Sequence, residues 1–203
     1  AQWVPLTNTQ YKVEHYQEQP NGSYVSKDTD NLAGKTGTTV TGTAKTYDGY
    51  TFDNSIAGTV ETGTIAGNGS LTLKLYYKAN TNTAYKVEHY QEQASGTHSL
   101  VDTDNLTGVT GDSVTGIAKT YAGSTFNNTI SRTVETGIIN GSGTLVLKLY
   151  YKANTNTEYK VEHYQEQANG AYLLVDTDNL TGKTGASVTA TVKSYAGYTI
   201  NLL

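Results

Sequence analysis

Three short pairs of neighbouring residues carry an acid and an imidazole side by side. Glu14-His15 recurs as Glu88-His89 and as Glu162-His163. Carboxylates and imidazoles serve in acid–base catalysis and in metal binding, so this pair is the first candidate for chemistry. Neighbouring residues of a β-strand point to opposite faces, and the two side chains cannot then hold one ligand together. The pair therefore favours a structural role, with the histidine half buried and hydrogen-bonded.

A second recurring group offers oxygen atoms. Asp28, Asp30 and Asn31 stand in the block Asp-Thr-Asp-Asn-Leu, which returns at 102–106 and 176–180. Hard cations prefer such ligands, which makes these three residues weak calcium candidates. The glycine and the distal glutamate of a helix–loop–helix calcium loop are missing, and Asx residues also build turns without metal. We predict no metal site and no cofactor.

The motifs of common enzyme classes are absent from the sequence. It contains no phosphate-binding glycine loop of recognised spacing, no nucleophile elbow and no His-Glu-x-x-His. Cysteine is absent as well, which removes thiolate chemistry and disulfides. We predict no catalytic residues and no enzymatic activity.

Tyrosine is the third recurring feature, with 17 residues against two Phe, one Trp and no Met. So many tyrosines cannot all be buried in a small module, and an exposed tyrosine offers a flat apolar face with a polar tip. Two interpretations stay open: a surface for sugars or for another protein, or packing in a chain that lacks other large apolar residues. The candidate ligand-binding residues are Tyr16, Tyr24, Tyr50, Tyr76, Tyr90, Tyr150 and Tyr164.

The elements that position these residues belong to a repeat. The stretch YKVEHYQEQ stands at 11–19, 85–93 and 159–167, a period of 74 residues. We predict repeat 1 at 11–84, repeat 2 at 85–158 and a truncated repeat 3 at 159–203, which lacks the final leucine-rich strand. Residues 1–10 are predicted to be a leader or the tail of a preceding unit. The polar connectors at 79–83 and 153–157 are short, which predicts an extended string of beads.

Composition and alternation predict mostly β-structure. The 35 Thr and 17 Tyr suit a pleated, half-buried surface. Residues 11–19 read as a strand, the triplet Leu71, Leu73 and Leu75 as a strand with one buried face, and 50–52 as a short strand. One or two helical turns are predicted through 114–119, after a cap at Asp112 or Ser113. The predicted class is therefore β-dominated α+β.

Charge and hydropathy exclude some partners. The net charge is −4, so the chain has no electrostatic footprint for nucleic acid. No apolar run approaches the roughly 20 residues that span a bilayer, so no membrane insertion is predicted. We expect a monomeric array, with strand exchange through the incomplete third repeat as an alternative.

Several blocks occur in a familiar order. They are Tyr-Lys-Val-Glu-His-Tyr, Gly-Lys-Thr-Gly at 34–37 and 182–185, Ala-Lys-x-Tyr-x-Gly-Tyr-Thr at 44–51, and a closing Leu-x-Leu-Tyr-Tyr-Lys strand. This order resembles the MucBP-type (mucin-binding protein) and B-repeat-like tandem repeats of Gram-positive surface adhesins. The resemblance implies tandem β-grasp-like modules on a secreted, often wall-anchored protein. No wall-sorting motif is present in the sequence.

Two functions follow as hypotheses. The first is adhesion: a non-catalytic repeat region outside the bacterial cell, at the cell surface or wall, that binds host mucin, another glycoprotein or a glycan. The second is a structural stalk that projects an adhesive head from the cell wall, since near-identical repeats suit a spacer of tunable length.

Overall fold

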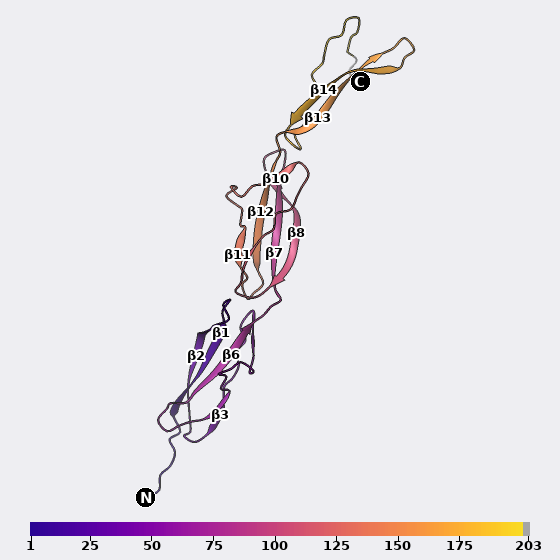
Figure 1. The fold of residues 1–203 in the computed structure, drawn as a ribbon. Coiled ribbons are helices and arrows are strands. Elements are labelled where there is room, and N and C mark those ends of the chain that lie inside the picture. Colours follow the sequence, from indigo (N-terminus) through magenta and orange to yellow (C-terminus); the bar gives the residue numbers. More distant parts are fainter. Residues whose placement is uncertain (201–203) are drawn as a thin grey trace. The chain divides into compact units, whose positions relative to one another are not determined.

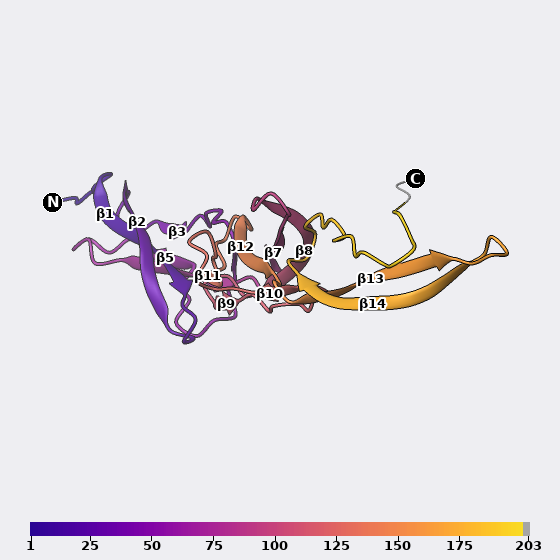
Figure 2. The same ribbon diagram turned by 90° about the horizontal axis from the view of Figure 1, so that it is seen from above.

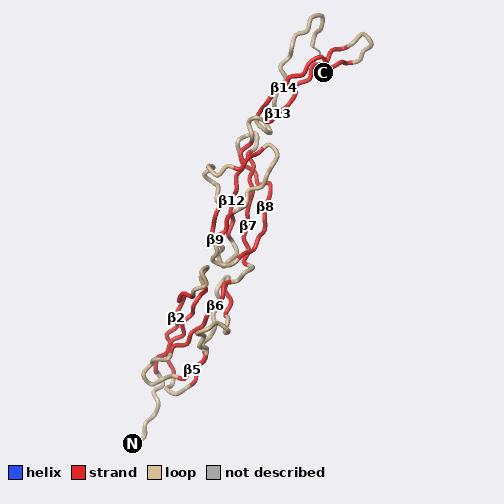
Figure 3. The backbone as a smooth tube through the Cα atoms, viewed as in Figure 1, coloured by secondary structure: helices blue, strands red, loops and turns tan. Residues whose placement is uncertain are grey.

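The computed structural model of the chain describes residues 1–200 and consists of β-strands joined by turns and loops (Figure 3). No helix occurs among these residues, and none of them forms a helical segment that could cross a membrane. The strands are β1 (Thr9–Glu18), β2 (Tyr24–Gly34), β3 (Thr39–Thr41), β4 (Tyr50–Phe52), β5 (Thr62–Thr64), β6 (Thr72–Ala79), β7 (Thr83–Glu92), β8 (His98–Gly108), β9 (Ser113–Thr115), β10 (Ser124–Phe126), β11 (Thr136–Ile138), β12 (Leu145–Ala153), β13 (Thr157–Glu166) and β14 (Tyr172–Gly182).

The chain divides into two compact units. The first comprises residues 1–87, 104–115 and 136–147, and the second comprises 88–103, 116–135 and the described residues from Lys148 onward. The boundaries of the three 74-residue repeats remain a prediction from the sequence.

The principal sheet of the first unit has the strand order β2-β1-β6-β4, and Figure 1 labels β1, β2 and β6. β1 and β2 form an antiparallel hairpin, because Asn21-Gly22 supplies the turn between them. Gly22 has φ of +78°, and the Ser23 N–H donates to Asn21 Oδ1 at 3.0 Å. β6 then lies parallel to β1, from Lys12 beside Thr72 to Gln17 beside Tyr77.

The core of this sheet confirms the predicted leucine alternation. Val13 of β1 is 1% exposed, while Leu73, Leu75 and Tyr77 of β6 are fully buried. Partly buried Leu71 packs against this cluster. Removing a side chain of this size from water contributes about 1.5–3 kcal/mol. The insertion of β6 beside β1 is therefore a main source of stability for the sheet.

Smaller elements complete the units. In the first unit, β3 pairs with β5 and β9 pairs with β11, both antiparallel. In the second unit, β10 pairs with β12, and β13 and β14 form a hairpin that Figure 2 shows as two strands side by side. A second four-stranded sheet has the order β10-β12-β7-β8.

The α+β part of the predicted class is wrong. Ser113–Thr115, at the start of the predicted helical turns, form β9 and pair with Thr136–Ile138. Gly116 then donates its N–H to Glu135 O at 2.8 Å. Threonine and glycine are weak helix formers, so a strand partner far along the chain decides their conformation. Because the described residues contain no helix, the β-grasp-like description of the modules is not supported either.

Candidate functional site

Two stacked tyrosines lie on the outer face of the first unit's sheet, opposite the core. Tyr16 of β1 and Tyr76 of β6 are neighbours in the parallel register. Their rings stack with centroids 4.9 Å apart and an interplanar angle of 16°. Tyr24, at the start of β2, meets the Tyr76 ring edge-on at 5.2 Å. The register of three strands thus gathers three of the predicted ligand-binding residues into one cluster.

Charged groups border this tyrosine cluster. The Tyr16 hydroxyl donates to Glu14 Oε2 at 2.5 Å, and the Lys74 ammonium lies 6.0 Å from the centre of the Tyr16 ring. The hydrogen bond to Glu14, together with burial, raises the pKa of Tyr16 to about 12. A phenolate beside a carboxylate is unfavourable, so Tyr16 stays a neutral donor at physiological pH.

The second unit contains a matching cluster. Tyr90 and Tyr150 stack at 4.8 Å, and the Tyr90 hydroxyl donates to Glu88 at 2.6 Å. His98 meets Tyr150 edge-on at 5.2 Å, and the Arg132 guanidinium lies 5.6 Å from its ring centre. Tyr150 is only 5% exposed, so it is the buried member of the stacked pair and packs beneath the Tyr90 ring. Tyr90 is the half-buried member of the stacked pair.

Two of the predicted residues lie outside these clusters. Tyr50 packs against the core of the first unit, because β4 joins the sheet at its other edge. Tyr164 of β13 is 52% exposed, and its hydroxyl donates to Glu162 at 2.6 Å. Glu14 and Lys74 were not among the predicted residues. Strand alternation places Glu14 on the face of Tyr16, and this signal could have identified it.

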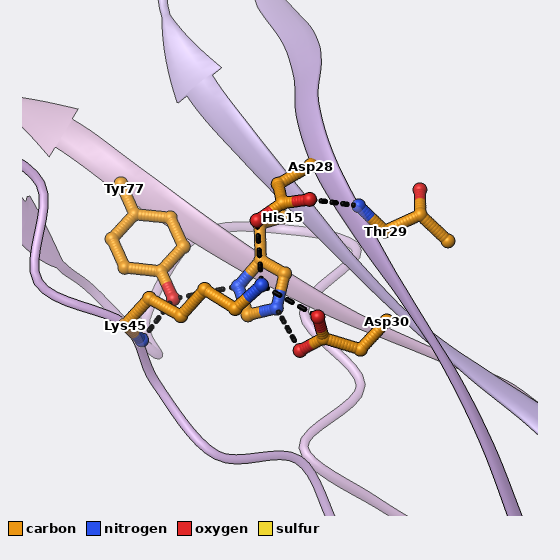
Figure 4. Close-up of polar contacts among 6 residues, drawn as sticks. All are labelled: His15, Asp28, Thr29, Asp30, Lys45 and Tyr77. Atoms are coloured by element: carbon orange, nitrogen blue, oxygen red, sulfur yellow. Dashed lines mark hydrogen bonds and ion pairs between the residues drawn. The ribbon is translucent and has the colours of Figure 1, made fainter.

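The recurring histidine lies on the opposite face, in a polar network that Figure 4 shows in close-up. His15 is fully buried, and its Nδ1 lies 2.8 Å from the Tyr77 hydroxyl. Its Nε2 lies 3.2 Å from Asp30 Oδ2. The Lys45 side chain reaches Asp28 at 2.5 Å and Asp30 at 2.6 Å. Three sheet strands and one loop thus meet at a single polar cluster.

Hydrogen-bond polarity assigns the protons in this network. The Lys45 backbone N–H donates to the Tyr77 hydroxyl at 2.9 Å, so the hydroxyl proton is free to go to His15 Nδ1. The other ring nitrogen then carries a proton and donates to Asp30. A neutral imidazole satisfies every partner in this arrangement, and the buried ring needs no charge.

Electrostatics in the network favour ion pairs. The hydrogen bond from Lys45 holds the pKa of Asp28 and that of Asp30 below their ordinary values. The two carboxylates in turn raise the pKa of the Lys45 ammonium. These contacts therefore hold the loop around residue 45 against β2, beside the buried His15.

The weak calcium candidates belong to this network. Asp28 and Asp30 come together beside Lys45, whereas Asn31 follows Asp30 in β2 and faces the other side of the strand. Among residues 1–200, no group of three or more acidic, histidine or cysteine side chains is arranged to hold a metal ion.

The network recurs in the second unit with the sequence repeat. His163 Nε2 lies 3.1 Å from Asp178, and Lys193 contacts both Asp176 and Asp178. The same spacing in residues 85–158 gives His89 Nδ1 2.8 Å from the Tyr151 hydroxyl. A repeated network of this kind indicates a structural role for histidine, lysine and aspartate.

A comparison with known protein families identifies the family of the repeat. The model of the MucBP domain matches residues 13–78 and 160–203, which together are more than half of the chain. The chain belongs to the MucBP domain family. The predicted MucBP resemblance is thereby confirmed, and both matched segments of this MucBP chain contain a histidine network and a β1-type hairpin.

Two solved structures are similar to the chain at low scores. Domains 3–4 of the Streptococcal High Identity Repeats in Tandem (SHIRT) from a cell surface protein match at 17% identity and a TM-score of 0.24, covering 71% of this chain and 98% of that one. The type 2 repeat of the mucus binding protein MUB from Lactobacillus reuteri matches at 14% identity and a TM-score of 0.20, covering 71% and 100%. No curated protein matches the chain. The family assignment depends on the family model alone.

Proposed function

We propose that this MucBP chain is a non-catalytic region of a bacterial surface protein and binds mucus glycoprotein outside the cell. Membership of the MucBP family supports mucin as the ligand class. The observation that carries the proposal is the stacked pair Tyr16 and Tyr76, which Tyr24, Glu14 and Lys74 surround.

The chemistry of this cluster suits sugars. Tyrosine rings offer apolar area to the C–H faces of a pyranose and lose little conformational freedom on binding. Glu14 and Lys74 both lie beside Tyr16, and a carboxylate can accept hydrogen bonds from sugar hydroxyls while an ammonium can donate them. Sialylated or sulfated mucin chains would bring negative charge toward Lys74. In the second unit, Arg132 beside Tyr150 offers the same kind of contact.

The test is binding of the full chain to immobilised mucin and to the same mucin after removal of its O-glycans. The variant Tyr16→Leu/Tyr90→Leu/Tyr164→Leu changes the equivalent position of all three repeats. Loss of the aromatic faces is expected to weaken binding at least about tenfold, which corresponds to ~1.4 kcal/mol. The control Tyr198→Ala removes a tyrosine that is 47% exposed and lies outside these clusters. Equal binding by all forms would overturn the proposal.

A stalk is the second candidate function. The contacts that the tyrosines already make within the chain favour it. The Tyr16 hydroxyl donates to Glu14, and the Tyr150 side chain is almost completely buried. A spacer needs such internal packing and no ligand. Absence of binding to mucin and to a glycan array, by a chain whose unfolding is cooperative, would favour the stalk over adhesion.

We also propose that the chain is monomeric at low concentration. The expected result is a mass in solution that stays at 21.8 kDa as the concentration rises. Strand exchange through residues 159–203 is the alternative, and it would appear as a dimer whose fraction grows with concentration.

A further inference from the structure

The tyrosine clusters of the two units share their stacked pair but differ in the side chains around it. Tyr16 and Tyr76 of the first unit correspond to Tyr90 and Tyr150 of the second, 74 residues later. The two pairs stack at 4.9 and 4.8 Å, and in each pair the first hydroxyl donates to a glutamate. The aromatic part of the site is therefore the same in both units, and any difference in ligand comes from the surrounding residues.

The first difference adds a positive charge. Gly58 lies beside Tyr76 in the first unit, where a Cβ at this glycine would be 3.4 Å from the Tyr76 hydroxyl. The second unit has the exposed Arg132 at the equivalent position, and its guanidinium lies 5.6 Å from the centre of the Tyr150 ring. A guanidinium is a planar fork of N–H donors that matches the oxygen atoms of carboxylates and of tetrahedral anions.

The second difference removes a negative charge. The Asp53 N–H donates to the Tyr76 carbonyl at 3.0 Å, and the Asp53 carboxylate accepts from the hydroxyl and the N–H of Ser55. These hydrogen bonds hold the pKa of Asp53 below its ordinary value, so the group is charged at neutral pH. Asn127 makes the same contacts beside Tyr150 with a neutral amide. The turn therefore requires a side-chain oxygen at this position but no charge.

The third difference replaces a phenol by an imidazole. His98 stands where the first unit has Tyr24, and each ring meets its stacked pair edge-on at 5.2 Å. A phenol titrates from neutral to negative, whereas an imidazole titrates from neutral to positive. Both ring nitrogens of His98 are buried and have no hydrogen-bond partner among residues 1–200. The imidazole thus keeps hydrogen-bonding capacity that the protein itself does not use.

A fourth difference concerns a glutamate near His98. Glu92 forms an ion pair with the Lys183 ammonium at 2.7 Å, which lowers the pKa of Glu92. In the first unit, the glutamate at the equivalent position is Glu18, and the residue equivalent to Lys183 is Val109, which carries no charge. The charge of Glu92 is balanced within its unit, so it repels an approaching anion less than Glu18 does.

From these four differences we propose that the second cluster selects glycans whose end carries an anionic group. The cluster comprises Tyr90, His98, Asn127, Arg132 and Tyr150. Arg132 binds the anion, and an amide in place of Asp53 removes a repulsive charge. The first cluster, in which Glu14 and Asp53 oppose Lys74, binds neutral and acidic glycans alike. The inference rests on the proposed function, because the stacked tyrosines hold the sugar in both clusters. A carboxylate and a sulfate ester share the chemistry that Arg132 recognises.

Full chains that keep one of the two clusters separate their selectivities. Tyr16→Leu/Tyr164→Leu keeps the second cluster, and Tyr90→Leu/Tyr164→Leu keeps the first. The probes are N-acetyllactosamine, its sialylated form and its sulfated form, measured by titration calorimetry. The second cluster is expected to bind at least one acidic form about tenfold more tightly than the neutral form, and the first cluster is expected to discriminate less than about threefold. A gain with the sialylated form alone supports a carboxylate ligand, and a gain with the sulfated form alone supports a sulfate ester.

Two variants of the second cluster assign the selectivity to its residues. Arg132→Gln is expected to abolish the preference for the acidic form. The exchange His98→Tyr/Asn127→Asp/Arg132→Gly installs the residues of the first cluster, so the affinity ratio is expected to fall to that of the first cluster. The control Lys160→Gln removes one positive charge from an exposed position of β13 outside the cluster and is expected to keep the preference.

The outcomes separate this proposal from the proposed function. A preference that survives both Arg132→Gln and the exchange, or one that both clusters show equally, would overturn the selectivity proposal. A preference that Lys160→Gln also abolishes would assign it to the charge of the whole chain and would overturn the proposal as well. Equal binding of all three glycans contradicts the selectivity alone, whereas no binding of any glycan by either cluster contradicts the proposed function and this proposal with it.

Discussion

The hydroxyl of Tyr77 connects the buried imidazole to the loop that covers it. It accepts from the Lys45 N–H and donates to His15 Nδ1. The variant Tyr77→Phe keeps the ring and leaves both partners unsatisfied, which costs about 1–3 kcal/mol. Hydrogen exchange of the β1 amides is expected to accelerate accordingly. It is measured on peptides that include residues flanking 11–19, because the sequence of 11–19 itself is identical in all three repeats.

Tyr11→Phe is the matched control for this prediction, because Tyr11 lies on the same sheet and makes no hydrogen bond through its hydroxyl among residues 1–200. Equal exchange rates in the two variants would show that the Tyr77 hydroxyl contributes nothing to stability.

The ion pairs of the network predict a dependence of stability on pH. Asp28 and Asp30 have lowered pKa values, so their contribution is present above the unfolded Asp pKa of about 3.9 and is lost as pH falls through the folded values. The Lys45 pKa is raised, so its contribution is present below the unfolded Lys pKa of about 10.4 and is lost as pH rises through the folded value.

The variant Lys45→Met/Lys119→Met/Lys193→Met removes the lysine from every copy of the network. Its Tm is expected to lie below that of the parent chain at pH 7, and the difference is expected to shrink at pH 2. The control Lys12→Met/Lys86→Met/Lys160→Met changes three exposed lysines at equivalent positions of the repeats. A difference that is the same at both pH values would contradict the ion-pair account.

At this scale, the sequence predicted part of the site. Strand alternation placed Glu14 and His15 on opposite faces, and the structure has His15 in the core and Glu14 beside Tyr16. The partner Lys45 was not predictable, because it lies in a loop 15 residues beyond Asp30 and no periodicity constrains its direction. Loop side chains are positioned by tertiary contacts that a local pattern does not encode.

At the scale of elements, β6 is the strand on which the sheet depends. Leu75 is fully buried against Val13 and Tyr77, and Leu75→Ala removes contacts that the surrounding side chains cannot restore. The expected cost is about 2–5 kcal/mol. Thermal unfolding of this variant is expected to begin at lower temperature, whereas Thr72→Ala on the outer face is expected to unfold close to the parent chain. Similar midpoints for both variants would contradict the central role of β6.

Strands with strong alternation were predictable, and short elements were less so. The leucine alternation identified β6, and 50–52 was confirmed as β4. The helical turns at 114–119 were wrong because a cap residue such as Ser113 also fits a strand end. Pairing with Thr136–Ile138, about 20 residues further along the chain, selects the strand conformation of Ser113–Thr115. Local propensities contain no information about such a distant partner.

At the scale of the whole molecule, the sequence repeat causes the same side-chain clusters to occur more than once. Equivalent residues form the stacked tyrosines at 16 and 76 and again at 90 and 150. A ligand that binds one cluster therefore has a second site on the same chain. Under the proposed function, a polymeric ligand that reaches both clusters would bind with higher apparent affinity than a single glycan.

The most direct test of the proposed function is to map a soluble mucin O-glycopeptide onto the chain by NMR. The account predicts shifts that concentrate on Tyr16, Tyr24 and Tyr90 and on their neighbours Glu14 and Lys74, and that Tyr16→Leu abolishes at the first cluster alone. Shifts confined to other surfaces, or none at saturating glycopeptide, would contradict it.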